Sequence, residues 1–139
     1  MSKASRYMPG IIFILILCSC ADQITSQCED AIPAGLQPKL SSIQQFIFTP
    51  SCAVTGCHSA ADQQQGLNLS SDNAHSNLVN VTSTEDGVLK RVEAGNSTRS
   101  WLMKKLNGDG TSVMPPAGQL TQAMIDTVGQ WIDAGALNN

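Results

Sequence analysis

Apolar side chains recur at three- and four-residue spacing in residues 121–134, near the end of the chain. This spacing places them on one face of an α-helix and leaves the polar residues on the other face. Thr121 is a suitable N-cap and Gly135 is a suitable stop. The pattern predicts an amphipathic helix, whose apolar positions are Met124, Ile125, Val128, Trp131 and Ile132.

Two shorter helices are indicated upstream. The serine pair at residues 41–42 can cap a helix that Pro50 ends, because proline lacks the amide proton that a helix interior needs. Residues 97–106 predict another helix, with Asn96 or Ser97 as its cap and Asn107-Gly108 as its stop. The apolar face of the first helix consists of Ile43, Phe46 and Ile47.

The segments between these helices are less regular. Residues 66–70 form a short extended pattern, and a polar stretch follows as far as Asn77. Residues 78–92 carry mixed signals that leave their structure open. The stretch Met114-Pro115-Pro116 cannot lie inside a helix, because each proline biases the residue before it toward extended geometry.

The start of the chain has the pattern of a targeting segment. Two basic residues precede an unbroken apolar run at residues 11–17, which is too short to span a bilayer. The following Leu17-Cys18-Ser19-Cys20 resembles the bacterial lipobox. That resemblance implies that residues 1–19 are a lipoprotein signal peptide and that Cys20 receives the lipid. An ordinary cleaved signal and an uncleaved membrane anchor are the alternatives.

The remaining chain divides into two parts. Residues 20–39 contain prolines, a glycine and scattered polar residues, which predicts a flexible tether behind the lipid. Residues 40–139 form one small domain. Ala21 follows Cys20, where an aspartate would signal retention at the inner membrane, so we expect the outer membrane, with the domain facing the periplasm or outward. The net charge of −3 argues against a nucleic-acid partner, since phosphate binding needs a basic face.

The most informative motif is Cys52-Ala53-Val54-Thr55-Gly56-Cys57-His58. Two cysteines followed at once by histidine are typical of c-type haem attachment. Each thiol adds to a haem vinyl group, and the adjacent imidazole is then held where it can bind iron. The gap between the cysteines is four residues, where two is usual, and Gly56 helps the longer loop because it tolerates unusual backbone conformations.

Other interpretations of the motif stay open. An exported protein can form a disulfide between Cys52 and Cys57, or between either of them and Cys28. A zinc site would have to draw on Cys52, Cys57, His58 and His75, which is a poor set of four ligands. Cys28 has no assigned role, and it is either free or paired with another chain.

Met114 is the best candidate for a second iron ligand. It stands before two prolines in a polar, glycine-rich loop, where a methionine is a poor core residue. Met103 and Met124 lie on predicted helices and are interpreted as core residues. His75 lies in the polar stretch and is interpreted as a surface residue. A cluster of basic residues is interpreted as a solvated rim, with a docking patch as the alternative, and consists of Lys90, Arg91, Arg99, Lys104 and Lys105.

Residues 43–136 resemble the small planctomycete-type cytochrome c domains and related cytochrome c-like bacterial lipoproteins. The matching segments are Ile47-Phe48, Gly56-Cys57-His58, Gly66-Leu67-Asn68-Leu69, Arg91-Val92-Glu93-Ala94-Gly95-Asn96, Ser100-Trp101-Leu102, Lys105-Leu106, Met114-Pro115-Pro116 and Trp131-Ile132-Asp133-Ala134-Gly135-Ala136. The resemblance implies a mainly α cytochrome c-like fold, in which short helices and loops wrap around one haem and the first and last helices pack together.

The same resemblance implies one covalent haem c held by Cys52 and Cys57, with His58 and Met114 as axial ligands. A buried haem also accounts for the aromatic content of only 4%. The expected function is electron transfer to redox partner proteins rather than enzymatic catalysis, because no nucleophile or acid–base pair stands out. The alternative function is a haem-free, disulfide-stabilised outer-membrane lipoprotein that acts as an interaction module. A haem sensor or peroxidase-like site with Met114 displaced is a third possibility.

Overall fold

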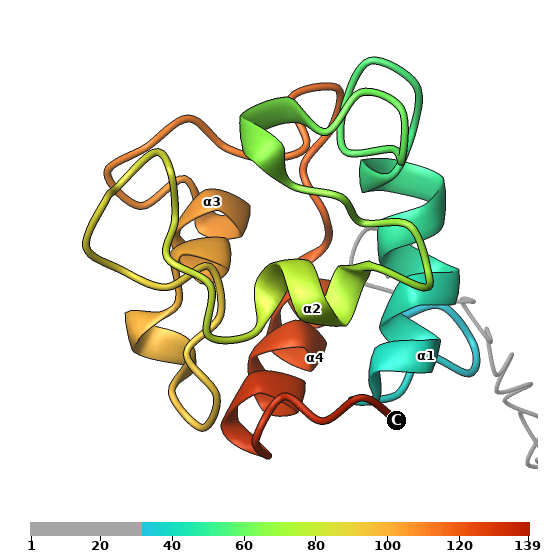
Figure 1. The fold of residues 1–139 in the computed structure, drawn as a ribbon. Helices are drawn as coiled ribbons and strands as arrows, with labels where there is room; N and C mark the ends of the chain where they lie inside the picture. Colours follow the sequence, from blue (N-terminus) through green and yellow to red (C-terminus); the bar gives the residue numbers. More distant parts are fainter. Residues whose placement is uncertain (1–31) are drawn as a thin grey trace, which may run out of the picture.

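The computed structural model describes residues 32–139, and this part of the chain is mainly helical, as predicted (Figure 1). Within it no β-strand forms. The segment that the sequence left open contains two isolated bridges, a parallel one between Val79 and Val92 and an antiparallel one between Thr82 and Lys90. The α-helices are α1 (Leu40–Ile43), α2 (Ala74–Leu78), α3 (Trp101–Asn107) and α4 (Gln122–Asp133).

Helix α4 confirms the clearest sequence pattern. The Thr121 hydroxyl accepts a hydrogen bond from the Met124 amide at 3.3 Å and so caps the helix. Gly135 follows the last turn with φ of 104°, a left-handed conformation that suits glycine. The buried face of α4 includes Ile125, Val128, Trp131 and Ile132.

The cap predicts a measurable loss of stability. Thr121→Ala removes the acceptor for the Met124 amide and should lower the free energy of unfolding by about 1 kcal/mol. Urea denaturation measures the change, and Gln130→Ala, an exposed substitution inside the same helix, is the matched control. Equal losses in the two variants would show that the hydroxyl does not act as a cap.

The cap predicted for the first helix is wrong. Ser41 and Ser42 lie inside α1, and Lys39 stands at the N-cap without a side-chain hydrogen bond. The end of the chain supplies the acceptors instead. The Leu40 amide donates to the Asn139 side-chain oxygen at 3.0 Å, and the Ser41 amide donates to the Asn139 carbonyl at 2.8 Å. The last residue therefore satisfies amides that every helix start leaves unpaired.

Pro50 does not end this first helix, contrary to the prediction. The helix continues from α1 into the π-helical segment η1 (Gln44–Cys52), which contains Pro50. The Ala53 amide donates to the carbonyl of Phe48, five residues back, at 2.7 Å. The wider π turn leaves room for a proline ring that would clash with the carbonyl four residues earlier in an α-helix. As a result, Cys52 lies on the last turn of a helix rather than in a loop.

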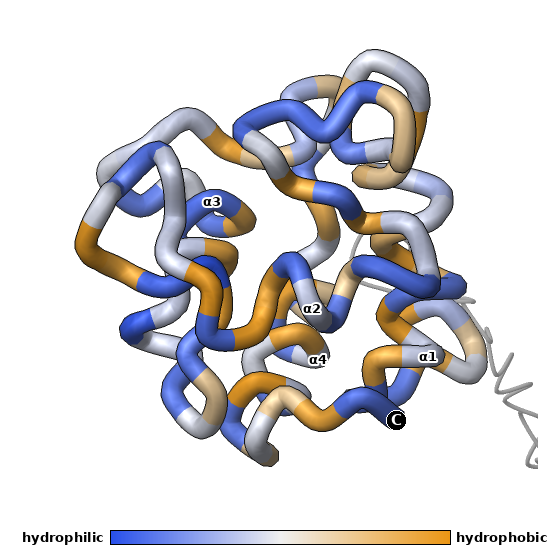
Figure 2. The backbone as a smooth tube through the Cα atoms, in the orientation of Figure 1, coloured by the Kyte–Doolittle hydropathy of each residue, from blue (hydrophilic) through white to orange (hydrophobic). Residues whose placement is uncertain are grey.

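The first and last helices contact each other, as predicted. Figure 2 shows hydrophobic segments where α1, α2 and α4 meet. Phe46 is partly buried and packs against the core, as its place on the predicted apolar face requires, and its ring lies toward Gly35. Phe48, which the pattern did not single out, is fully buried. The core cluster includes Ile43, Ile47, Phe48, Val128, Trp131 and Ile132.

The predicted helix at residues 97–106 is interrupted. It is divided into the 3₁₀ turn η3 (Ser97–Arg99) and α3, with Ser100 extended between them. The Ser100 hydroxyl is fully buried, donates to the Asn96 carbonyl and accepts from the Glu93 amide, and these bonds favour the break. Gly108, with φ of 69°, ends α3 as predicted. Helix α2 lies in the stretch that the sequence showed only as polar.

Several predictions concern residues outside the described part of the chain. The signal peptide at 1–19, the lipidation site Cys20, Cys28 and most of the tether lie there. The last residues of the segment predicted as a tether contact the domain: Leu36 packs against the core, and the Ser42 hydroxyl donates to the Gly35 carbonyl at 3.2 Å. Among residues 32–139, no helix has the length and apolar character needed to cross a membrane.

Candidate functional site

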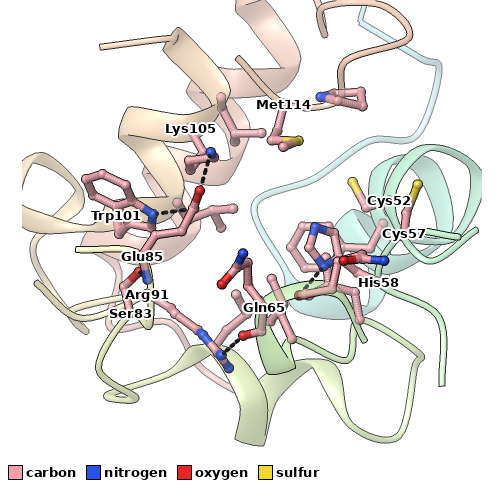
Figure 3. Close-up of a pocket in the computed structure, with 18 of the residues that line it drawn as sticks. Cys52, Cys57, His58, Gln65, Ser83, Glu85, Arg91, Trp101, Lys105 and Met114 are labelled. Atoms are coloured by element: carbon pink, nitrogen blue, oxygen red, sulfur yellow. Dashed lines mark hydrogen bonds and ion pairs between the residues drawn. The ribbon is translucent and has the colours of Figure 1, made fainter. Parts of the chain in front are cut away.

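A mainly apolar cavity of about 310 Å³ lies between η1, α2, α3 and the loop that joins α3 to α4 (Figure 3). This loop contains Met114, Pro115 and Pro116 and is called the proline-containing loop below. This volume is typical of pockets that bind small molecules and cofactors. Its wall includes the side chains of Phe48, Leu67, Leu69, Leu78, Leu102 and Leu106. The cavity therefore offers a hydrophobic chamber at the centre of the fold.

All four residues that the sequence singled out for haem binding line this cavity. Cys52, Cys57 and His58 come from the end of η1 and the loop after it, and Met114 comes from the loop between α3 and α4. Figure 3 shows Met114 across the open space from His58. His75, the other candidate ligand, lies elsewhere.

The loop that carries the motif is held by hydrogen bonds at both of its ends. The His58 amide donates to the Cys52 carbonyl at 3.1 Å, and the Leu69 amide donates to the His58 carbonyl at 2.8 Å. Gly56 has φ of 80°, as its predicted role in the long gap requires, and its amide donates to the Asp62 carboxylate at 2.9 Å. The backbone thus accommodates the four-residue gap between the cysteines.

His58 is oriented by the backbone of the next loop. Its Nδ1 atom lies 3.1 Å from the Gln64 carbonyl oxygen. Because a carbonyl oxygen can only accept, Nδ1 carries the proton and Nε2 keeps its lone pair, which is the tautomer that metal ligation through Nε2 needs. Burial lowers the pKa of His58, although hydrogen bonds to the backbone of Gln64 and Leu67 oppose this. The ring is therefore neutral at neutral pH, and the lone pair of its Nε2 is available to a metal ion.

The segment that holds His58 is strained. Gln63 and Gln65 have φ of 39° and 56°, in the left-handed region that residues with side chains rarely adopt. They flank Gln64, whose carbonyl accepts from the imidazole. Such strain persists where the surrounding structure enforces it, and it concentrates at functional sites.

The two cysteines are not bonded to each other. Burial, together with the charge of Cys57, raises the pKa of the Cys52 thiol to about 12, so this sulfur is protonated at neutral pH. The zinc alternative also lacks a ligand set, because no group of three or more His, Cys, Asp or Glu in residues 32–139 is arranged to hold a metal ion. The cavity presents two thiols and one imidazole along a single wall.

His75 is partly exposed, as a surface residue would be, but one side of its ring is held by the backbone. Its Nε2 lies 2.9 Å from the Ala136 carbonyl near the end of the chain. Met103 and Met124, by contrast, pack against the core as predicted. The only methionine among the three candidates that reaches the cavity is Met114.

One side of the cavity is polar, and sequence reasoning missed it. Glu85 accepts a hydrogen bond from Trp101 Nε1 at 3.1 Å and forms an ion pair with Lys105 Nζ at 3.0 Å. The Trp101 hydrogen bond is the main reason that the pKa of Glu85 lies below its ordinary value. Figure 3 shows this trio on the far side of the cavity from the cysteines.

Arg91 adds a second buried cation to the cavity wall. Its side chain donates to the Asn77 carbonyl at 2.9 Å and to the Gln65 carbonyl at 2.8 Å, and the residue is 8% exposed. Burial lowers its pKa. No carboxylate of residues 32–139 forms an ion pair with it. The cavity thus combines an apolar chamber with a cationic edge.

The interpretation of the basic residues as a solvated rim is therefore wrong for Arg91 and Lys105. It agrees with the structure for Arg99 and Lys104, which form surface ion pairs with Glu93 and Asp109. Helical spacing offered a usable signal for Lys105. It stands four residues after Trp101 and beside Leu106 on the face of α3 that lines the cavity. No comparable periodic signal exists for Arg91, which lies in an irregular segment.

Comparisons with known proteins add no assignment to this geometry. No protein-family model matches the chain, and no curated protein or solved structure matches it either. The molecule is defined by its own features as a mainly helical protein with a thiol-, imidazole- and thioether-lined cavity.

Proposed function

We propose that this protein is a c-type cytochrome, an electron carrier with one covalently attached haem. The observation that carries the proposal is the convergence of Cys52, Cys57, His58 and Met114 on one apolar cavity. These residues come from two segments that are far apart in the sequence. Chance rarely brings two thiols, an imidazole and a thioether to the same chamber.

The residues present fit a haem by the chemistry of their donor atoms. Cys52 and Cys57 would hold it through thioethers, and His58 Nε2 and Met114 Sδ would be the axial ligands. When bound, the haem supplies an iron that changes between the ferric and ferrous states. The resemblance of residues 43–136 to small cytochrome c domains supports the same assignment.

The chain's own work is to position ligands and exclude water. The Gln64 carbonyl fixes the tautomer and orientation of His58. Apolar side chains such as Leu69 and Leu78 keep the chamber dry, which limits the reorganisation that accompanies a change of charge. The hydrogen bond from the Met114 amide to the Lys105 carbonyl, at 2.8 Å, anchors the loop on the other side.

The setting proposed for this carrier is the bacterial cell envelope. Its support is the lipobox-like sequence that ends at Cys20, which would tether the domain to the outer membrane through a lipid. The partners would be redox proteins that approach the haem edge. No catalytic role is part of the proposal.

A pyridine haemochrome spectrum of the purified protein tests the function directly. We expect the spectrum of a haem with both vinyl groups saturated, and colour that stays with the protein through acid–acetone extraction. Fractionation of the same cells should place this colour in the membrane. A colourless protein with an intact fold would support the disulfide-stabilised interaction module instead, and extractable colour would rule out covalent attachment.

A further inference from the structure

Lys105 has contacts that a surface lysine of α3 does not need. Its ammonium lies 3.0 Å from Glu85 Oε1, 3.2 Å from Thr111 Oγ1 and 3.3 Å from Ser112 Oγ. Its carbonyl accepts from the Met114 amide at 2.8 Å. The residue is only 6% exposed. A single side chain thus joins α3 to two loops, one of which leads directly into Met114.

A buried ammonium that joins these segments has an unfavourable free energy of desolvation. Removing a lysine charge from water is unfavourable, and well-packed apolar residues often stabilise a fold as much as a buried ion pair does. The partners of Lys105 are nevertheless arranged for it. Glu85 is fixed from its other oxygen by Trp101, and two hydroxyls of the Met114 loop complete the ammonium's hydrogen bonds. This set of partners is explained by a need to fix the geometry of the loop rather than by a need to stabilise the fold.

We propose that Lys105 is the positioning residue for Met114. Its ammonium ties residues 111–112 to Glu85, and its carbonyl holds the Met114 amide, so the loop cannot move away from the cavity wall. The part of this proposal that concerns the iron rests on the proposed function, in which Met114 is an axial ligand. A thioether is a neutral ligand without a hydrogen bond of its own to fix it, and the loop must therefore be held through its backbone and neighbours.

Competition by imidazole for the methionine position tests this role. Imidazole can replace Met114 only when the loop opens, so its apparent affinity reports the cost of opening. Lys105→Met keeps an unbranched side chain, one atom shorter, and removes the ammonium. We expect imidazole to bind the holoprotein at least about tenfold more tightly in this variant, as the loss of one charged hydrogen bond produces.

Two controls separate positioning from charge and from stability. Lys104→Met removes the neighbouring ammonium, which pairs with Asp109 at the surface, and should change the imidazole affinity by less than about twofold. Met103→Ala loosens the packing of α3 against Gly129 without touching the Met114 loop. It should lower the melting temperature and leave the imidazole affinity unchanged. Equal affinities in Lys105→Met and Met103→Ala would overturn the proposal.

A second variant guards against a failure of Lys105→Met to fold. Glu85→Gln keeps the shape of the side chain and a hydrogen-bond acceptor but removes the negative charge that Lys105 faces. We expect an intermediate increase in imidazole affinity, between the wild type and Lys105→Met. No increase in Glu85→Gln would remove Glu85 from the proposed arrangement and overturn it as stated.

Hydrogen exchange of the Met114 amide distinguishes this inference from the proposed function. The measurement uses the full chain as purified, whatever its haem content. Faster exchange, by about tenfold, in Lys105→Met but not in Lys104→Met would establish the positioning role even in a protein without haem. A haem-containing protein in which neither exchange nor imidazole affinity changes would keep the proposed function and overturn the role of Lys105.

Discussion

Replacing both Cys52 and Cys57 with serine should abolish covalent haem attachment, and each single replacement should leave at most one thioether. A serine hydroxyl matches the shape of the thiol but does not add to a vinyl group under the same conditions. The remaining ligands can still bind iron, so the expected result is a low yield of protein whose haem is removed by acid–acetone. Denaturing gel electrophoresis with a haem stain measures the covalent fraction.

Val54→Ala is the matched control for these variants. Val54 belongs to the same loop, is exposed, and does not line the cavity, so its removal should leave attachment intact. The disulfide interpretation predicts something different. It expects both single variants to destabilise a colourless protein to the same extent, without any change in haem content. Normal covalent haem in both Cys52→Ser and Cys57→Ser would contradict the assignment of the attachment site.

Local sequence patterns predicted those parts of the fold that local interactions decide. The helix after Thr121 has its cap, its apolar stripe and its glycine stop within a few residues of each other, and all three agree with the structure. The end of α3 at Gly108 follows the same logic. In these segments, hydrogen bonds between near neighbours and helical periodicity determine the result.

The first helix shows why other features were not predictable. Its start is capped by Asn139 from the opposite end of the chain, a contact that no local pattern reveals. Its passage through Pro50 depends on a π turn, which has no reliable sequence signature. The π turn carries the helix on to Cys52, which lines the cavity, so a detail that positions the site has no local sequence signature.

The candidate site divides in the same way. The residues with distinctive chemistry could be identified from the sequence, because cysteine–histidine spacing and a proline-flanked methionine are unusual patterns. The residues that support them were not identified. Arg91 and Lys105 have the side chains of an ordinary solvated surface, and only the packing of irregular loops around the cavity shows that they are buried.

Met114→Ala should keep the covalent haem and lose the axial sulfur. The basis is the position of Met114 in the cavity wall, on a loop held to α3 by the bond to the Lys105 carbonyl. Without the thioether, the iron would be five-coordinate or bound to water. The reduction potential should fall, because sulfur favours the ferrous state more than water does. The weak long-wavelength absorption band of ferric iron–methionine ligation should disappear.

Three further variants establish that this effect belongs to Met114 alone. Met103→Ala and Met124→Ala remove half-buried side chains that pack against the core, so each should cost about 2 kcal/mol of stability and leave the spectrum unchanged. His75→Ala breaks the contact with the Ala136 carbonyl, outside the cavity, and should also preserve the spectrum. Loss of the wild-type spectrum and reduction potential in any of these variants, with retention of both in Met114→Ala, would assign the ligand to that other residue. Loss of the wild-type spectrum and reduction potential in Met114→Ala alone would instead show that the proline-containing loop supplies the axial sulfur.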